Sequence, residues 1–160
     1  LAQVAGRAGR GTAPGKVVLQ TYNPDHFAIQ AARAQDFMAF YNREIQFRRA
    51  LRYPPFARMT QLKISGRDKG QTRQQAEEIG RLCRQLQNSG AAGLKEIQIL
   101  GPIEAPVTRI AGRHRWQILL KAPSADRIQE MLRVLLSQNP ALFAGRDIHI
   151  AIDVDPFFMM

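Results

Sequence analysis

The chain has a single cysteine, Cys83, among its 160 residues. A lone cysteine excludes an internal disulfide and cannot build a zinc site by itself. Its place in a helical apolar pattern predicts a small buried core residue, which is the usual environment of a free cysteine. Nothing in the cysteine content indicates an oxidising compartment, so we expect a cytoplasmic protein.

Long apolar runs are also missing. The longest, such as residues 118–120, extend over a few residues, whereas a membrane span needs about 18. We therefore expect no membrane partner. Hydrophobic residues make up 45% of the chain, which is ordinary for a globular protein that buries a core and excludes a wholly disordered chain or a fibrous repeat.

Acidic residues are scarce beside basic ones. There are 13 Asp and Glu against 23 Lys and Arg, for a net charge of +10, and most of the cations are arginine. Arginine presents a planar fork that grips a phosphate with two hydrogen bonds. This balance favours a nucleic acid or a nucleotide as the partner.

The first part of the chain is interpreted as the end of one domain followed by a connector. The chain does not begin with Met, and we expect it to be a piece of a longer protein. The β-prone run 16–22 predicts a strand, and since a strand is not stable without its sheet, we assign residues 1–22 to a domain that begins upstream. Asn-Pro-Asp at 23–25 predicts a helix start, with helices over 25–34 and 36–51. Two prolines at 54 and 55 end the second helix, so residues 23–56 form the predicted helical connector.

From residue 57 onward the pattern predicts one complete domain. Apolar alternation predicts strands at 59–65, 96–100, 115–122 and 147–154, and helical spacing predicts helices at 71–88 and 125–137. The order β-α-β-β-α-β is typical of ferredoxin-like domains. We therefore predict an α+β fold over 57–160, in which two helices cover one face of a single sheet.

The string Gln3-x-x-Gly-Arg7-x-Gly-Arg10 is the most specific feature near the start. Glycine lets the backbone approach a ligand, and the spacing places Gln3, Arg7 and Arg10 on one side of a helical turn. Two such arginines can neutralise charge that develops on a γ-phosphoryl group. We interpret these three residues as catalytic and the two arginines as nucleotide-binding; the alternative is an Arg-Gly terminus that contacts nucleic acid loosely.

This string resembles the sixth helicase motif of superfamily 2. The rest of the chain resembles the C-terminal end of the PriA (primosomal protein N′) family, the bacterial replication-restart DNA helicases. The resemblance covers essentially the whole chain, and the residues that carry it are Gln20-Thr21, Pro24, His26, Tyr53-Pro54-Pro55-Phe56, Gly101-Pro102, Ala105-Pro106, Arg113 to Gln117 and Asp153 to Pro156.

The resemblance implies a parent protein that hydrolyses ATP with Mg²⁺ and unwinds DNA 3′ to 5′ at stalled forks. Arg7 and Arg10 would face ATP between two helicase lobes, with Gln3 supporting them and residues 1–22 closing the second lobe. Implied partners are branched and single-stranded DNA, single-strand binding protein and other primosome proteins. The family's zinc lies outside this chain, and the chain lacks the phosphate-binding loop and the acidic Mg²⁺ motif. We therefore expect the isolated chain to be inactive and to hold no cofactor.

A basic segment between the predicted strands at 96–100 and 115–122 is a second candidate site. Ala-Gly at 111–112 predicts a tight turn, which makes a basic hairpin tip. The alternation of Trp116 with its neighbours favours a core position over stacking on a base. His114 has no accompanying ligand set, so we predict no metal there. The predicted DNA-binding residues are Arg109, Arg113, His114 and Arg115.

Three further charged features leave alternatives open. The predicted helix at 36–51 and the residue after it carry a basic face, which consists of Arg43, Arg48, Arg49 and Arg52. This face contacts DNA, is solvated, or is docked on the missing helicase lobe. Asp153 and Asp155 favour a structural role at the chain end over a metal site. Arg127 and Gln129, at the start of the last helix, are predicted to hold an acidic peptide tail such as that of single-strand binding protein.

Two functions from different classes follow. The chain binds DNA within an ATP-driven machine, or it is a non-catalytic docking module that braces the helicase core and binds single-strand binding protein. A ribosomal-type RNA-binding domain fits the fold and the charge but leaves the helicase string unexplained. We expect a monomer, or a dimer formed through the exposed strand 16–22.

Overall fold

The structure, a computed structural model, describes residues 1, 3 and 16–156. The chain divides into two compact units, residues 1–51 and 52–160. No helix among the described residues is both long and apolar enough to cross a membrane.

The first unit contains two helices, α2 (Phe27–Ala34) and α3 (Phe37–Ala50). Each begins at a residue whose side chain accepts a hydrogen bond from the helix backbone. His26 Nδ1 accepts from the N–H of Ala28 at 3.2 Å, and Asp36 accepts from that of Ala39 at 2.8 Å. The predicted start of α2 at residue 25 was wrong, because residues 23–26 form a turn and His26 is the cap.

Aromatic contacts join these two helices. The ring of Phe27 lies 5.9 Å from that of Phe40 and 5.7 Å from that of Phe47, and the Arg43 guanidinium lies 5.4 Å above it. None of the residues of α2 or α3 is buried. The two helices are therefore held together by a small aromatic cluster that is partly exposed to solvent.

The strand predicted at 16–22 is not formed in this structure, and its place in the sheet of an upstream domain stays a prediction. Residues 16–21 have no regular secondary structure and are exposed. The described residues supply no neighbouring strand for this segment, and an isolated strand has no hydrogen-bond partners to hold it.

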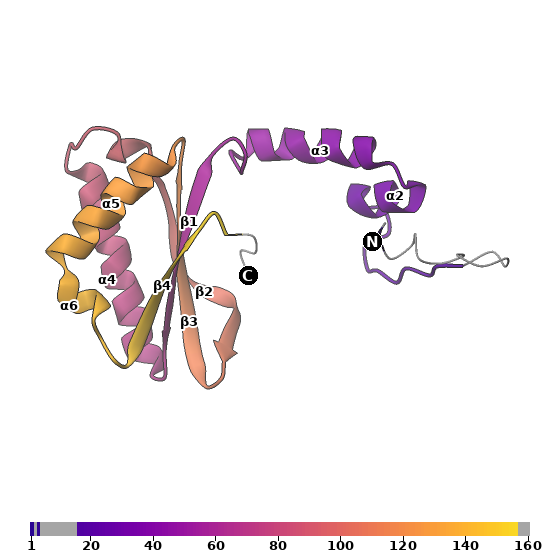
Figure 1. The fold of residues 1–160 in the computed structure, drawn as a ribbon. Coiled ribbons are helices and arrows are strands. Elements are labelled where there is room, and N and C mark those ends of the chain that lie inside the picture. Colours follow the sequence, from indigo (N-terminus) through magenta and orange to yellow (C-terminus); the bar gives the residue numbers. More distant parts are fainter. Residues whose placement is uncertain (2, 4–15, 157–160) are drawn as a thin grey trace. The chain divides into compact units, whose positions relative to one another are not determined.

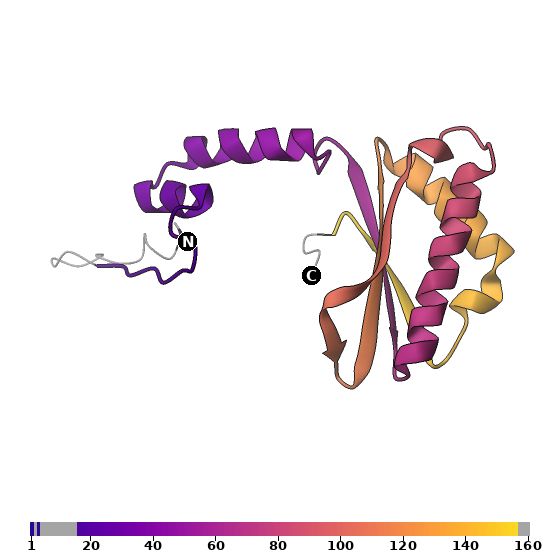
Figure 2. The ribbon, with the colours of Figure 1, turned by 180° about the vertical axis from the view of Figure 1, so that it is seen from behind.

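The second unit is a ferredoxin-like α+β domain, as predicted (Figures 1 and 2). Its four strands are β1 (Arg58–Gly66), β2 (Gln98–Ile110), β3 (Arg113–Ala122) and β4 (Ile148–Val154), in the sheet order β2-β3-β1-β4. All neighbouring strands are antiparallel. The helices α4 (Lys69–Asn88) and α5 (Ala125–Gln138) lie on one face of the sheet, and two short elements, η1 (Leu94–Glu96) and α6 (Pro140–Phe143), complete the domain.

The core lies between the sheet and these two helices. It contains most of the predicted alternating strand residues and helix stripes, many of them fully buried. The prediction was wrong for Leu136 of the last helix and for Ile152 and Val154 of the last strand, which are 37%, 39% and 59% exposed. Trp116 is 5% exposed and belongs to this cluster, which confirms the core interpretation over the stacking one. Cys83 is fully buried, as predicted.

Strand β2 differs most from the prediction, since it extends to Ile110 instead of ending at 100. Its pairing with β3 is irregular between Leu100 and Ile103 and again between Glu104 and Arg109. Pro102 and Pro106 lie in these two irregular stretches, because proline cannot donate to the ladder and is confined to edges and bulges. Gly101 has a φ of +95°, and a Cβ there would lie 2.7 Å from the carbonyl oxygen of Gln117.

Candidate nucleic-acid interface

The hairpin between β2 and β3 forms the turn that the sequence predicted. Ala111 and Gly112 have φ values of +48° and +77°. Two consecutive positive φ values define the two-residue turn that matches the twist of paired strands. The turn therefore sets the register of the arginines beside it.

The sheet register places this hairpin beside the end of β1. His114 lies opposite both Arg109 and Gly66, and Arg115 lies opposite Ser65. Paired residues share one face of a sheet, and successive residues alternate between faces. Arg109 and His114 therefore project from one face of the sheet and Arg115 from the other.

Two arginines that the sequence analysis did not single out lie at the same end. Arg67 directly follows β1, and Arg146 lies two residues before β4; both are exposed. Gly66 at the end of β1 is paired with Ile148 at the start of β4, so the register brings these segments together (Figure 1). We call this end of the sheet the arginine end; its residues are Arg67, Arg109, Arg113, Arg115 and Arg146.

The arginine end differs from the rest of the domain in its electrostatics. None of its five arginines forms an ion pair with a carboxylate among the described residues, whereas cations elsewhere in the domain do so repeatedly. A guanidinium has five N–H donors and no acceptor. Donors that neither a carboxylate nor a backbone carbonyl accepts remain for a phosphate.

Arg113 has a structural role at this end. Its Nη2 donates to the carbonyl oxygens of Ser65 and Asp147, both at 2.9 Å. These bonds join the start of β3 to the end of β1 and to the segment before β4. Arg115 Nη1 donates to the carbonyl of Val107 at 3.3 Å, within the irregular part of β2. The side chains of Arg67, Arg109 and Arg146 form no hydrogen bond or ion pair with the described residues.

The chain-end aspartates of β4 form ion pairs. Asp153 accepts from Lys63 Nζ at 2.5 Å and Asp155 accepts from Arg58 Nη1 at 3.0 Å. These pairs join β4 to β1, which is the structural role that we favoured. Within the described part of the chain, no group of three or more His, Cys, Asp or Glu side chains is placed to hold a metal ion.

The predicted protein-binding pair lies on α5. Arg127 forms an ion pair with Glu96 of η1, and its hydrogen bond lowers the pKa of the Glu96 carboxyl. Gln129 is exposed two residues further on. Residues two apart do not share a helix face. The structure therefore does not bring these two side chains together, and their common role stays a prediction.

The predicted nucleotide-binding residues are barely covered by the structure. Arg7 and Arg10 lie outside the described residues, and Gln3 is exposed. On the basic helix, Arg48 forms an ion pair with Glu44 at 2.8 Å, and Arg43 covers Phe27. The proposed roles of these residues stay predictions.

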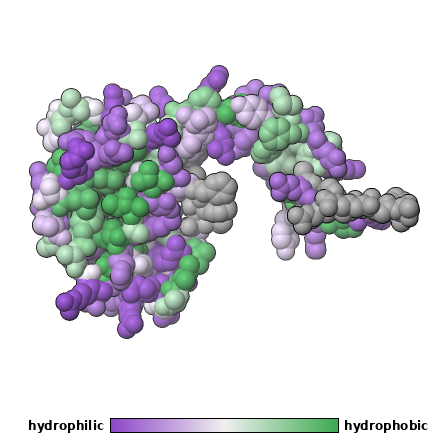
Figure 3. All heavy atoms as spheres, in the orientation of Figure 1, coloured by the Kyte–Doolittle hydropathy of each residue, from purple (hydrophilic) through white to green (hydrophobic). Residues whose placement is uncertain are grey.

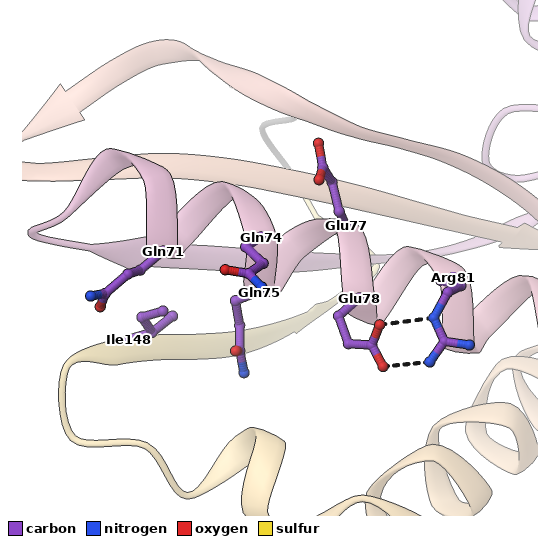
Figure 4. A pocket seen from close by; sticks show the side chains of 7 residues that line it. All are labelled: Gln71, Gln74, Gln75, Glu77, Glu78, Arg81 and Ile148. Carbon is purple, nitrogen blue, oxygen red and sulfur yellow. Dashed lines mark hydrogen bonds and ion pairs between the residues drawn. The ribbon is translucent and has the colours of Figure 1, made fainter.

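An open groove of about 560 Å³ lies beside α4 (Figure 4). Three glutamines, Glu77, Glu78, Arg81 and Ile148 line it. Arg81 donates twice to Glu78, at 2.8 and 2.5 Å, which lowers the pKa of that carboxyl. The groove thus has amides and carboxylates with its one arginine already paired, a chemistry that does not suit a phosphate.

Comparison with known proteins places the chain in a family. The family model described as "Primosomal protein N C-terminal domain" matches residues 49–157. Over 98% of its length the chain is 37% identical to the "Replication restart protein PriA" of Synechocystis, of which it spans 17%. The proteins of the same name from Bacillus subtilis and Haemophilus influenzae are 33% and 35% identical over 100% and 96% of the chain, which spans 19% and 20% of them. The chain thus spans about a fifth of the length of these relatives, and it belongs to the family of primosomal protein N C-terminal domains.

Proposed function

We propose that this chain is the C-terminal part of a replication restart protein and that its arginine end binds DNA. The observation that carries the proposal is the convergence of five arginines, none paired with a carboxylate of the described chain, from four segments at one end of the sheet. The family and the names of the relatives support the setting in replication restart. The substrates are stalled forks and single-stranded DNA.

The geometry suits a strand that passes over the end of the sheet. Arg109 and Arg115 project from opposite faces, and Arg67 and Arg146 lie on the adjacent segments. Val107 and Ile110 of the hairpin are 47% and 51% exposed and offer apolar surface to unstacked bases. Trp116 is buried and takes no part in stacking, whereas Arg113 positions the three segments.

The test compares two variants of equal charge by fluorescence anisotropy with a labelled fork and a labelled single strand. The site variant is Arg67/Arg109/Arg146→Ala, since these side chains form no bonds that hold the fold. The control variant is Arg81/Lys95/Arg133→Ala, which removes three cations elsewhere on the domain. We expect the site variant to bind at least about tenfold more weakly than the control at moderate salt. Equal affinities would contradict the proposal.

The ATP-linked function belongs to the parent protein in this proposal. Gln3, Arg7 and Arg10 would face ATP and its Mg²⁺ in a complete helicase, while zinc is bound outside this chain. Arginines that stabilise a transferring phosphoryl group are worth about 10³-fold or more in kcat. We expect Arg10→Ala in the full-length protein to lower DNA-stimulated ATP hydrolysis to that extent, and unchanged hydrolysis would refute the assignment.

A second candidate function is docking, and the exposed aromatic surface of α3 favours it. Phe37, Tyr41 and Phe47 are 68%, 47% and 48% exposed. The occupant we propose is the upstream part of the parent, because the relatives are about five times longer than this chain. Failure of a folded sample to bind DNA even at low salt would favour this function.

We also propose that the chain binds the acidic tail of single-strand binding protein through Arg127 of α5. An Arg127→Glu variant that binds this tail with unchanged affinity would contradict the proposal.

A further inference from the structure

The open groove beside α4 continues to the arginine end of the sheet. A second hollow of about 400 Å³ adjoins it, and the two share Gln71, Gln75 and Ile148 in their walls. The second hollow is also lined by Asp147 and by Arg146, which belongs to the arginine end. Figure 3 shows hydrophilic residues gathered at this lower end of the domain. A strand that is held at the arginine end therefore meets the groove directly.

The groove contains two glutamine amides that are open to a ligand. Gln71 and Gln74 are exposed on α4, and their side chains form no hydrogen bond with the described residues. Gln75 differs, because its Nε2 donates to the carbonyl of Leu142 in α6 at 2.6 Å. A glutamine amide has one acceptor oxygen and two N–H donors. The Watson–Crick edge of an unpaired base also presents donors and acceptors, so the two chemistries match.

The carboxylates of the groove direct phosphates away from it. Glu77 forms an ion pair with Arg73 at 2.7 Å, and Glu78 forms one with Arg81 at 2.5 Å, so their charges are balanced within α4. Asp147, beside the arginine end, forms no ion pair with the described residues and repels an anion. A strand in this position therefore keeps its phosphates at the arginine end, and the groove is left for uncharged bases.

The shape of the groove suits a flat ring. Figure 4 shows Gln71 and Gln75 projecting from α4 on the side of Ile148, whereas Glu77 points away. Ile148 is half-buried against the core and offers apolar surface to the face of a base. The volume of about 560 Å³ lies within the range of about 300–1,000 Å³ that is usual for small-ligand sites.

We propose that the groove beside α4 holds unpaired bases of the DNA strand whose phosphates lie at the arginine end. This proposal rests on the proposed function, because the arginines must hold the strand first. Gln71 and Gln74 bond to the edges of the bases, and Ile148 contacts their faces. In a duplex the same edges are occupied by the partner strand, so duplex DNA gains nothing from the groove. The groove thus gives the domain a preference for single strands.

The affinity test compares Gln71/Gln74→Ala with the control Gln85/Gln138→Ala by fluorescence anisotropy. The probes are a labelled single strand of about 15 nucleotides and a labelled duplex of the same length. All four glutamines are exposed on α4 or α5, and alanine favours helix, so both variants keep the fold. We expect the site variant to bind the single strand about tenfold more weakly than the control, and the duplex equally well. Its salt slope stays unchanged, since no charge is removed.

Photocrosslinking locates the strand by a second route. A thiol-reactive photocrosslinker is attached to Gln74→Cys or, as the control, to Gln85→Cys, which lies about three turns further along α4. Cys83 is buried and stays unlabelled. We expect the labelled single strand to crosslink at position 74 and not at position 85.

The outcomes separate this proposal from the proposed function. Equal affinities of the two glutamine variants for the single strand, equal loss of duplex binding, or equal crosslinking at the two positions would each overturn the groove proposal. If Arg67/Arg109/Arg146→Ala binds weakly while Gln71/Gln74→Ala binds normally, the arginine end stands and only the groove proposal fails. If the arginine variant binds as tightly as its own control, both proposals fail.

Discussion

The two units of this chain use apolar residues in opposite ways. The helix pair α2 and α3 contains four phenylalanines and a tyrosine, yet none of its residues is buried. The ferredoxin-like domain has one tryptophan and mostly aliphatic residues, and it buries many of them completely. Apolar content alone therefore does not make a core.

The difference arises from the partners that each element has. In the domain, strands distant in sequence supply neighbours on both sides, and two helices close one face. Within the described residues of its own unit, the helix pair packs only through the contacts between α2 and α3, and two short helices are marginal in water without a further surface. The domain is thus the stable part, and the helix pair has surface left over for a partner.

The largest expected contrast between the units is in thiol reactivity. Burial raises the pKa of the Cys83 thiol to about 11, so the reactive thiolate is scarce in the folded domain at neutral pH. In a Cys83→Ala background, Ile45→Cys places a thiol at a half-buried position of α3. We expect Cys83 to react with a thiol reagent about a thousandfold or more slowly, since it reacts only when the domain opens. Similar rates would show that the domain core is not closed.

Core truncation gives the next largest contrast. Leu62 is fully buried beneath both helices, so Leu62→Ala should lower the free energy of unfolding by about 3 kcal/mol. Phe27→Ala should change it by less than about 0.5 kcal/mol, because Phe27 lies in the other unit. The measurement is guanidinium unfolding followed by the fluorescence of Trp116, the one tryptophan of the chain. A large effect of Phe27→Ala would mean that the two units unfold together.

Two helix caps of matched geometry sharpen the comparison. The carboxylates of Asp68 and Asp36 accept from the backbone N–H groups of Gln71 and Ala39 at 2.7 and 2.8 Å. Asp68→Ala should cost the domain about 1 kcal/mol in the same experiment. Asp36→Ala should leave the tryptophan transition in place and reduce only the helical circular dichroism. Equal shifts of the transition would contradict the division into units.

The smallest expected effect is on the pKa of Lys121, and it tests whether Arg52 is part of the second unit. Burial, and next the charge of Arg52, lower the pKa of the Lys121 ammonium. The unfolded chain therefore binds more protons than the folded one just below the ordinary lysine pKa, and stability rises with pH there. Arg52→Ala should raise the pKa of Lys121 partway back in an NMR titration. Arg67→Ala, at the arginine end, should leave it unchanged, and the reverse result would misplace the boundary.

The sequence was sufficient for the domain because its core patterns are local. Alternation at 59–65 and the helical stripe through Ile79 and Cys83 have the period of the element that they form. Strand β2 was truncated in the prediction because its prolines break the pattern, although proline is compatible with an edge strand at bulges. The run 16–22 has strand composition but no neighbour among the described residues, and composition does not supply one.

The candidate site was half predictable for a related reason. The hairpin arginines are close in sequence, and the Ala-Gly turn marks them. Arg67 and Arg146 are 79 positions apart in the sequence. Only the register of β1 with β4 brings them to the same end of the sheet. The structural role of Arg113 was equally hidden, since its acceptors are carbonyl groups of Ser65 and of the segment before β4.

The salt dependence of DNA binding tests the central claim most directly. Each phosphate contact on a single strand contributes about 0.7 to the slope of log affinity against log salt. Removal of Arg67, Arg109 and Arg146 should therefore reduce that slope by about 2 relative to the intact chain, while the Arg81/Lys95/Arg133→Ala control keeps it. Slopes that are the same for the site variant and the control would show that the +10 charge acts diffusely and that the arginine end is not the DNA-binding surface.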